Sequence, residues 1–312
     1  MKATVIVPTH GDRGPLLPHS LGSVLNQTES DLEIFVFGDG VSDDTRRVIQ
    51  SLQQGDERIR FFDDPKDGRR GEARRHRHLR EARGDIVCYL CDRDLMLPDH
   101  IDIMHGLLQQ HNFAHTLMAR IVPDGRVLLN MRRYNLQRKA DVDWIVAPER
   151  TYSLGLSVVA HTLEHYRELP HGWRETPSNV MTDHYMWAQF LVHPHNRPVS
   201  SDELSILYFP RGYAPGAPSR TVSQWLDEFA AWESLLADPA ALQGFREGVT
   251  RRALAPHLRA MEVFRNRLER HPALRRSLRA MPRLHRPLLR LYEHLAQRRA
   301  AGGGGTRPPA AK

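Results

Sequence analysis

The chain has 312 residues, of which 40% are hydrophobic, and a formal net charge of +7. This length suits one large domain, or one domain with a smaller appendage, and the composition is sufficient for a buried core. No apolar run reaches the roughly 18 to 20 residues that cross a bilayer. Met1-Lys2 leads directly into a strand pattern without the features of a signal peptide. We therefore expect a soluble, cytoplasmic protein.

The basic charge is concentrated near the C-terminus. Residues 251–299 contain fourteen Arg, three Glu and no Lys, whereas residues 1–250 carry a net charge of −6. Few aromatic residues lie among these arginines, so the sequence pI of about 9.7 does not indicate a nucleic-acid partner. Three interpretations stay open for this segment: a solvated or partner-packed helical face, a peripheral contact with anionic lipid at the inner face of the membrane, and a surface for an acidic acceptor. The oligomeric state is not indicated.

The first third of the chain alternates between strand and helix patterns. Short apolar runs predict strands at residues 3–7, 32–37, 59–62 and 85–91, and helical spacing predicts helices at 16–27, 43–53 and 72–82. Ser42 or Asp43 is expected to cap the second of these helices. The alternation predicts an α/β fold, with a mostly parallel sheet flanked by helices.

The later elements are a helix at 99–111, a hairpin of 116–122 with 126–131, a strand at 154–161 and a helix at 183–192. Beyond residue 219 the pattern becomes helical, and prolines are expected to divide it into short helices; these are Pro239, Pro256, Pro272, Pro282 and Pro287. We therefore predict a catalytic domain at 1–218, an Arg-rich helical appendage at 219–300 and a disordered tail at 301–312.

Polar side chains follow three of the predicted strands. Thr9 follows the first, Asp39 the second, and the pair Asp92 and Asp94 the fourth. In an open parallel sheet, ligands bind beyond the carboxyl ends of the strands, so these residues should share one rim. Two carboxylates there suit a divalent cation that neutralises a diphosphate. Asp39, between two glycines, suits either a contact with a base or ribose or an ordinary turn.

These motifs together resemble the inverting, GT-A-fold glycosyltransferases of family 2. The resemblance covers residues 3 to about 100 and is carried by Ile6-Val7-Pro8-Thr9, Gly38-Asp39-Gly40, Gly71 through Arg75-His76, Ala82-Arg83-Gly84-Asp85, and Asp92-Arg93-Asp94 with Pro98. It implies transfer of a sugar from a nucleotide-sugar donor, most often UDP-linked, to a hydroxyl of a carbohydrate or other acceptor. It also implies a Mn²⁺ or Mg²⁺ cofactor and inversion at the anomeric carbon.

The resemblance also implies roles for individual residues. The nucleotide-sugar would be held by Pro8, Thr9, His10, Asp39, Arg75, Asp92 and Arg93. The metal would be bound by Asp94 with Asp92. A later segment, from Gly172 to Trp187, resembles the part of the family that carries the catalytic base and assigns that role to Asp183. Asp183 could instead cap the helix that follows it, and Thr182 is an equally good candidate for that cap.

The chain departs from the family pattern at three positions: Arg93 replaces an acid, His76 replaces an asparagine, and Thr182 replaces the usual glutamate. None of them removes a required carboxylate.

Several residues allow both a functional and a structural interpretation. His161 and Trp173 could face the acceptor or simply pack in the core. His193 or His195 could join the metal site, as a late histidine does in some GT-A enzymes, or lie in a solvated loop.

Two alternative functions are weaker. A sugar-nucleotide nucleotidyltransferase would use a phosphate loop, for which residues 10–14 are a poor match. A non-catalytic scaffold would act through the basic helices. The sequence identifies neither the sugar nor the acceptor.

Overall fold

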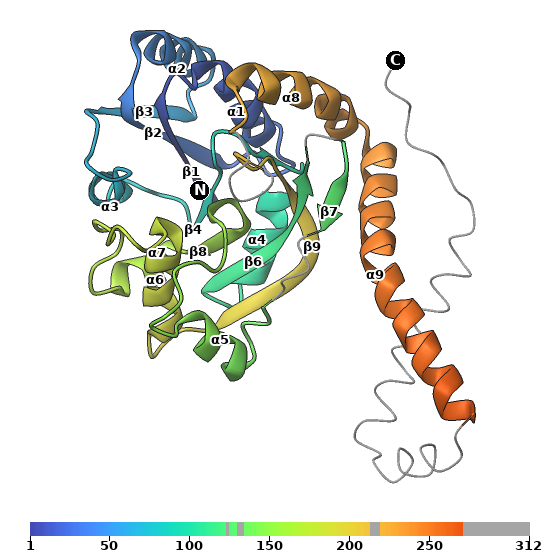
Figure 1. The fold of residues 1–312 in the computed structure, drawn as a ribbon. Helices are drawn as coiled ribbons and strands as arrows, with labels where there is room; N and C mark the ends of the chain where they lie inside the picture. The colour runs from blue at the N-terminus through green and yellow to red at the C-terminus, as the bar shows by residue number, and fades with distance from the viewer. Residues whose placement is uncertain (123–124, 130–133, 213–218, 271–312) are drawn as a thin grey trace. The chain divides into compact units, whose positions relative to one another are not determined.

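The computed structural model describes residues 1–122, 125–129, 134–212 and 219–270 (Figure 1). Its strands are β1 (Ala3–Gly11), β2 (Leu32–Val41), β3 (Ile59–Asp64), β4 (Ile86–Tyr89), β5 (Leu95–Met96), β6 (Phe113–Ile121), β7 (Val127–Leu129), β8 (Val159–Thr162) and β9 (Pro198–Tyr208). Its α-helices are α1 (Leu17–Leu25), α2 (Asp43–Gly55), α3 (Glu72–Leu79), α4 (His100–Leu108), α5 (Lys139–Ile145), α6 (Leu163–Glu168), α7 (Thr182–Val192), α8 (Val222–Ala237) and α9 (Pro239–Arg270).

The strands of the described residues form one sheet in the order β3-β2-β1-β4-β8-β6-β9-β5. β7 lies outside this order and pairs with β6. β1 is parallel to β2 and β4, and β2 is parallel to β3. β4 is buried along its whole length, as is expected for a central strand covered by helices on both faces. The predicted mostly parallel sheet flanked by helices is confirmed.

The second half of the sheet is mixed. β8 is antiparallel to both β4 and β6, β9 is parallel to β6, and β5 is antiparallel to β9. The strand predicted at 154–161 is shorter than expected, because a 3-10 turn at Leu156–Val158 precedes β8. The hairpin of β6 and β7 is confirmed by the pairing of Ile121 with Val127, although part of its turn lies outside the described residues.

The first compact unit extends from Met1 to Arg246, and the second covers Glu247 to Lys312. The domain boundary predicted after residue 218 therefore lies inside the first unit. The reason is that α8 is fastened to that unit by Arg220, whose buried guanidinium donates to the carbonyl oxygens of Ile121 (2.9 Å) and Pro210 (2.6 Å).

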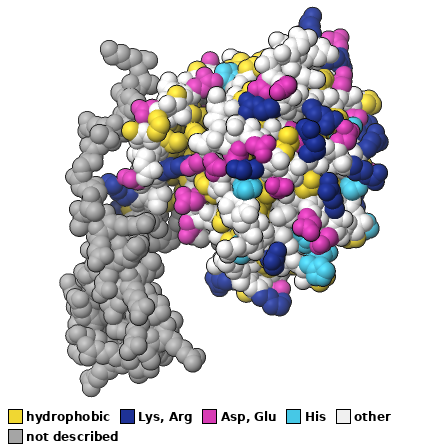
Figure 2. All heavy atoms as spheres, turned by 180° about the vertical axis from the view of Figure 1, so that it is seen from behind, with side chains coloured by type: hydrophobic (Ala, Val, Ile, Leu, Met, Phe, Trp, Pro, Cys, Tyr) yellow, Lys and Arg dark blue, Asp and Glu magenta, His cyan; other side chains and the backbone are white. Residues whose placement is uncertain are grey.

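The expectation that Pro256 ends a helix is wrong, because α9 continues from Pro239 to Arg270. An interior proline removes one backbone hydrogen bond, and a long helix can retain its other bonds. The tail predicted at 301–312 lies outside the described residues. Within the described part of the chain, no helix is both long and apolar enough to cross a membrane. Acidic and basic side chains are intermixed on the face of the molecule shown in Figure 2.

Candidate active site

The rim beyond β1 and β4 brings Thr9 and Asp92 into contact. Thr9 Oγ1 donates to Asp92 Oδ2 at 3.0 Å, and Arg13 Nη1 donates to Asp92 Oδ1 at 2.7 Å. The Asp92 carboxylate is 2% exposed. Parallel pairing of β1 with β4 creates this contact, since both strands end at the same edge. The predicted juxtaposition of these two strand ends is therefore present.

Asp94 lies deeper and is held by two donors. Ser157 Oγ donates to Asp94 Oδ2 at 2.6 Å, and the backbone N–H of Phe209 donates to Oδ1 at 3.2 Å. Burial raises the pKa of Asp94 from 3.8 to about 6, despite these bonds and the nearby charge of Arg93. Ser157 also accepts from the backbone N–H of Cys91 at 3.0 Å, so one hydroxyl orients the segment on which both aspartates lie.

Arginine side chains surround these carboxylates. Arg211 Nη2 lies 3.2 Å from His10 Nε2. Burial lowers the pKa of Arg211, and the positive charges of Arg13, Arg93 and Arg70 lower it further. The Nε of Arg93 is buried without a hydrogen-bond partner among the described atoms. Together these side chains present more positive charge than Asp92 and Asp94 neutralise, as an anion site requires.

The pKa of His10 is lowered, first by burial and then by the charge of Arg13. His10 is therefore favoured in its neutral form, and it lies at this rim as the motif predicted. Pro8 precedes it in β1, where it pairs with Phe37 of β2 and helps to fix the strand. In this structure Pro8 therefore supports the strand end from which Thr9 and His10 extend.

Asp39 lies at the end of β2 and holds the loop that precedes α3. Its Oδ1 accepts from the backbone N–H of Asp67 at 2.7 Å, and its other oxygen pairs with Lys66. The side chain is 13% exposed. Gly71 approaches it with a φ of +70°, a backbone conformation that favours glycine. Both interpretations of Asp39 are thus compatible with its position, because it stabilises a turn at the edge of the site.

Arg75 is a buried cation on α3. Its guanidinium carbon lies 5.0 Å from the centre of the Trp173 ring, and Nη2 donates to the carbonyl oxygen of Arg70 at 2.6 Å. Burial lowers its pKa, whereas the charges of Glu72 and Asp39 oppose that shift. Among the described residues, no carboxylate forms an ion pair with Arg75 within 4 Å. A buried cation without a paired carboxylate is suited to an anionic ligand.

Asp183 lies in the first turn of α7 and is 9% exposed. The structure shows that neither Asp183 nor Thr182 caps this helix, because the cap position is Met181 and no side chain bonds there. Burial raises the pKa of Asp183, and the charges of Arg70 and Arg75 partly oppose it. This interaction links Asp183 electrostatically to the arginines of the rim.

His161 and Trp173 lie in the core, which contradicts the prediction that they face an acceptor. His161 is completely buried; its Nε2 lies 2.7 Å from the Tyr89 hydroxyl, and its Nδ1 lies 2.9 Å from the carbonyl oxygen of Thr162. Burial lowers the pKa of His161 to about 3, so it stays neutral. Trp173 is 2% exposed and donates from Nε1 to the same Tyr89 hydroxyl at 3.2 Å. Packing explains both residues.

His193 and His195 are grouped with His165 and Glu168 after α6 and α7, away from the aspartates of the rim. β8 is antiparallel to β4, so α6, which follows β8, begins at the edge where β4 starts. Asp92 and Asp94 follow the opposite end of β4. The structure therefore contradicts the option that either histidine joins a metal at Asp94.

Sequence reasoning missed the rim arginines Arg13, Arg70 and Arg211. Arg13 could have been found, because it lies in the loop directly after the first strand. Arg211 could not, because the strand that brings it to the rim, β9, was not predicted.

The fold and this rim define a GT-A type of α/β protein. The model of the family described as "Glycosyl transferase family 2" matches residues 4–170, more than half of the chain. The chain therefore belongs to glycosyltransferase family 2. Asp183 lies beyond the matched segment.

Similar proteins agree with this membership. A 118-residue segment is 39% identical to GalNAc(5)-diNAcBac-PP-undecaprenol beta-1,3-glucosyltransferase of Campylobacter jejuni, covering 36% of each chain. A 111-residue segment is 29% identical to chondroitin synthase of Pasteurella multocida, covering 35% of this chain and 11% of that protein. The match thus spans about a third or less of these curated relatives. Among solved structures, S. aureus TarS 1-349 in complex with UDP-GlcNAc is similar in fold, with a TM-score of 0.52, 16% identity, and coverage of 82% of this chain and 73% of that one.

Proposed function

We propose that the protein transfers a sugar from a nucleotide-sugar donor, UDP-linked, to an acceptor hydroxyl with inversion. The observation that carries this proposal is the group of two buried aspartates among the arginines of the rim, together with a third buried aspartate in the first turn of α7. The family membership supports sugar transfer. A solved structure of similar fold, S. aureus TarS 1-349, is a complex with UDP-GlcNAc, which supports a UDP-linked donor.

The arginines suit the diphosphate of the donor. When the bond between sugar and phosphate breaks, negative charge builds on the leaving nucleotide, and fixed cations in a buried site stabilise it. Arg93 has an unused buried donor, and Arg75 has no paired carboxylate among the described residues. Both side chains are therefore available to an anion, while Thr9 and Arg13 hold Asp92 in position.

A divalent cation, Mn²⁺ or Mg²⁺, fits Asp94 chemically. Each of its oxygens accepts one bond from a protein donor, so lone pairs are left for a hard cation. Ligating carboxylates are commonly held by such second hydrogen bonds. Asp94 and Asp92 would hold the ion, which would supply additional positive charge to the diphosphate. Arg93 lies in the electrostatic field of both carboxylates and competes with the ion for them.

Asp183 is proposed as the general base. It would remove the proton from the acceptor hydroxyl, which attacks the face of the anomeric carbon opposite the leaving nucleotide and so inverts its configuration. Burial raises the pKa of Asp183, which makes it a better proton acceptor than an exposed aspartate.

The alternative functions gain no support. A nucleotidyltransferase would bind phosphate in the loop after β1, but Arg13 of that loop forms an ion pair with Asp92. A scaffold without activity would not require three buried aspartates, which are costly to keep charged.

Thermal unfolding with added ligands tests the proposal. UDP together with Mn²⁺ should raise the melting temperature of the whole chain, because both bind only the folded state. Arg75→Gln should reduce the shift caused by UDP, whereas Arg47→Gln, a change at an exposed residue of α2, should leave it unchanged. A chain that no nucleoside diphosphate stabilises, with or without the metal, would contradict the proposed donor class.

A further inference from the structure

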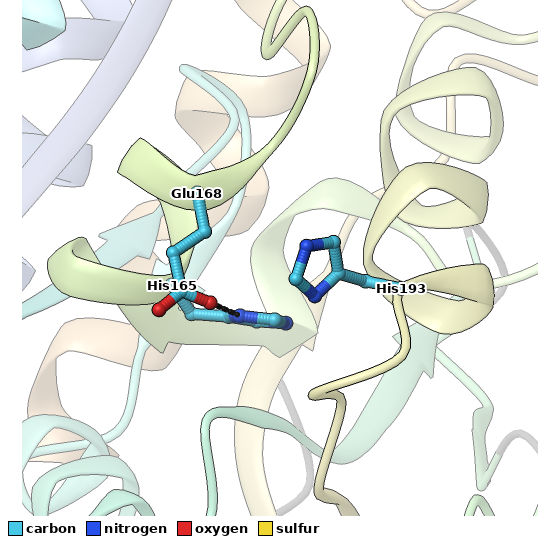
Figure 3. A group of neighbouring side chains, drawn as sticks. All are labelled: His165, Glu168 and His193. Carbon is cyan, nitrogen blue, oxygen red and sulfur yellow. Dashed lines mark hydrogen bonds and ion pairs between the residues drawn. The ribbon is translucent and has the colours of Figure 1, made fainter.

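A second group of ligating side chains lies apart from the aspartate rim. His165 and Glu168 lie one helical turn apart on α6, and His193 directly follows α7 (Figure 3). One potential ligand atom from each of the three lies within 4.8 Å of the others. His195 is close by, with its Nδ1 3.7 Å from Glu168 Oε2.

The hydrogen bonds leave one nitrogen of His165 unused. Its Nδ1 lies 3.1 Å from Glu168 Oε2, and its Nε2 is buried without a hydrogen-bond partner among the described atoms. His165 is 3% exposed, and the ring of His193 meets it at a centroid distance of 4.8 Å (Figure 3). A buried imidazole nitrogen without a donor or acceptor is costly unless a ligand occupies it.

The chemistry of the group selects a class of metal. We propose that His165, His193 and Glu168 bind one divalent transition-metal ion of the Zn²⁺ class, with His195 as an additional ligand within reach. Imidazole nitrogens with one carboxylate suit Zn²⁺, Ni²⁺ and Cu²⁺ better than Mg²⁺ or Ca²⁺. To bind the ion, Glu168 would exchange its bond to His165 Nδ1 for a bond to the metal.

Coordination requires rotation of the two more exposed side chains. Zn²⁺ is bound at about 2.0 to 2.1 Å from nitrogen, so tetrahedral donors lie roughly 3.3 Å apart. Glu168 is 43% exposed and His193 is half-buried, so their side chains can rotate toward the ion while His165 stays fixed. A surface pocket of about 560 Å³, lined in part by His165, Glu168 and His195, gives the ion a route from solvent.

The position of the site suggests its role. α7 has Asp183 in its first turn and is followed by His193, so a metal at His193 would tie the far end of this helix to α6. The ion would thereby stabilise the helix on which Asp183 lies without touching the rim. This inference stands on the cluster alone and does not depend on the proposed transferase activity.

Zinc binding by the untagged, chelator-stripped whole chain tests the proposal, with a chromogenic chelator as the competitor. One equivalent of Zn²⁺ should bind, and the melting temperature should rise with it. His193→Ala and Glu168→Gln should each weaken binding by at least about 10-fold. Both residues are partly exposed, so these variants should fold. The melting temperature of each variant without metal checks that it does.

Two controls locate the ion. His171→Ala removes an exposed histidine outside the group and should leave zinc affinity unchanged, as should Asp94→Asn at the rim. Wild-type chain that binds no equivalent of Zn²⁺ would overturn the proposal. So would variants at His193 and Glu168 that bind zinc like the wild type, or an Asp94→Asn variant that loses it.

Discussion

The protonation state of individual buried aspartates determines whether this rim can bind a cation or accept a proton. Asp94 is 1% exposed and has a pKa of about 6, compared with 3.8 for an ordinary aspartate. The folded chain therefore binds this proton more tightly than the unfolded chain. Between these two pH values the free energy of unfolding falls as pH rises, and at neutral pH the ionised group opposes folding by a few kcal/mol at most, on the order of 1.4 kcal/mol per pKa unit.

Asp94→Asn should consequently stabilise the metal-free protein. The amide can accept from the Phe209 N–H and donate to Ser157 Oγ, so the neutral side chain keeps both contacts without the cost of a buried charge. We expect the free energy of unfolding at pH 8 to rise by roughly 1 to 3 kcal/mol. Urea unfolding in the presence of a chelator measures this free energy. The difference from the wild type should vanish below about pH 4, where Asp94 is protonated in the folded and the unfolded chain. A destabilised variant at pH 8 would show that the charge is not costly in the fold.

Asp183→Asn should remove activity while keeping donor binding. Loss of a general base costs about 10² to 10⁴ in rate, because the acceptor proton has no other partner in the transition state. The rate constant kcat at saturating donor measures this loss, and the affinity for UDP should be unchanged. An unaltered kcat would assign the base to another residue.

Asp183 should also determine the pH below which the reaction slows. A base must be deprotonated to act, and burial raises the pKa of Asp183. The wild-type rate should therefore fall on acidification at a pH above the 3.8 of an ordinary aspartate. The pH dependence of kcat measures it, in a range where circular dichroism shows that the chain is folded.

At the level of elements, the parallel half of the sheet was predictable because its strands are apolar, short and separated by helices. The Ser42 cap was also predictable, since its Oγ accepts from the Thr45 N–H at 3.3 Å. β9 was not predictable, because it begins with Pro198 and has exposed polar residues in its first half. Its burial is created by pairing with β6, a contact that is remote in sequence.

The candidate site shows the same limit. Asp92 and Asp94 follow a strand that could be recognised, so their place at the rim was predictable. The hydroxyl of Ser157 and the N–H of Phe209 that hold Asp94 are 63 and 115 residues away from it. The sequence around His161 predicts a strand but does not show which face of the sheet this side chain lies on. Only the assembled core shows that it is buried.

Arg220 should prove essential for the attachment of α8. Its guanidinium is 3% exposed, and it also pairs with Glu228 of α8 at 2.8 Å. Arg220→Met would leave that carboxylate and two carbonyl oxygens without their donor, so we expect a loss of about 3 kcal/mol in the free energy of unfolding. Urea unfolding measures it. Arg47→Met, which breaks an exposed pair with Asp44, serves as the control and should change stability by about 0.5 kcal/mol or less.

At the level of the whole molecule, the basic charge lies outside the unit that contains the rim. Residues 251–299 carry a net charge of +11, and all of them belong to the second unit. Segments rich in arginine suit an anionic lipid surface. We therefore propose a peripheral membrane contact through this segment.

Vesicle sedimentation tests that contact. The whole chain should bind vesicles that contain anionic lipid and not neutral ones, and binding should weaken as salt is raised. A chain ending at residue 270 loses eight of the fourteen arginines of residues 251–299 and should bind less. Equal binding by the shortened chain would place the lipid contact elsewhere.

The release of nucleotide from a panel of sugar nucleotides tests the central claim most directly. With Mn²⁺ present, the wild-type chain should release UDP from at least one UDP-sugar by slow hydrolysis, since water can replace the acceptor. Arg75→Gln should reduce that release, and Asp94→Asn should abolish its dependence on the metal. Turnover by Asp94→Asn that equals wild type and responds equally to Mn²⁺, or a wild-type chain inert toward every sugar nucleotide, would contradict the account.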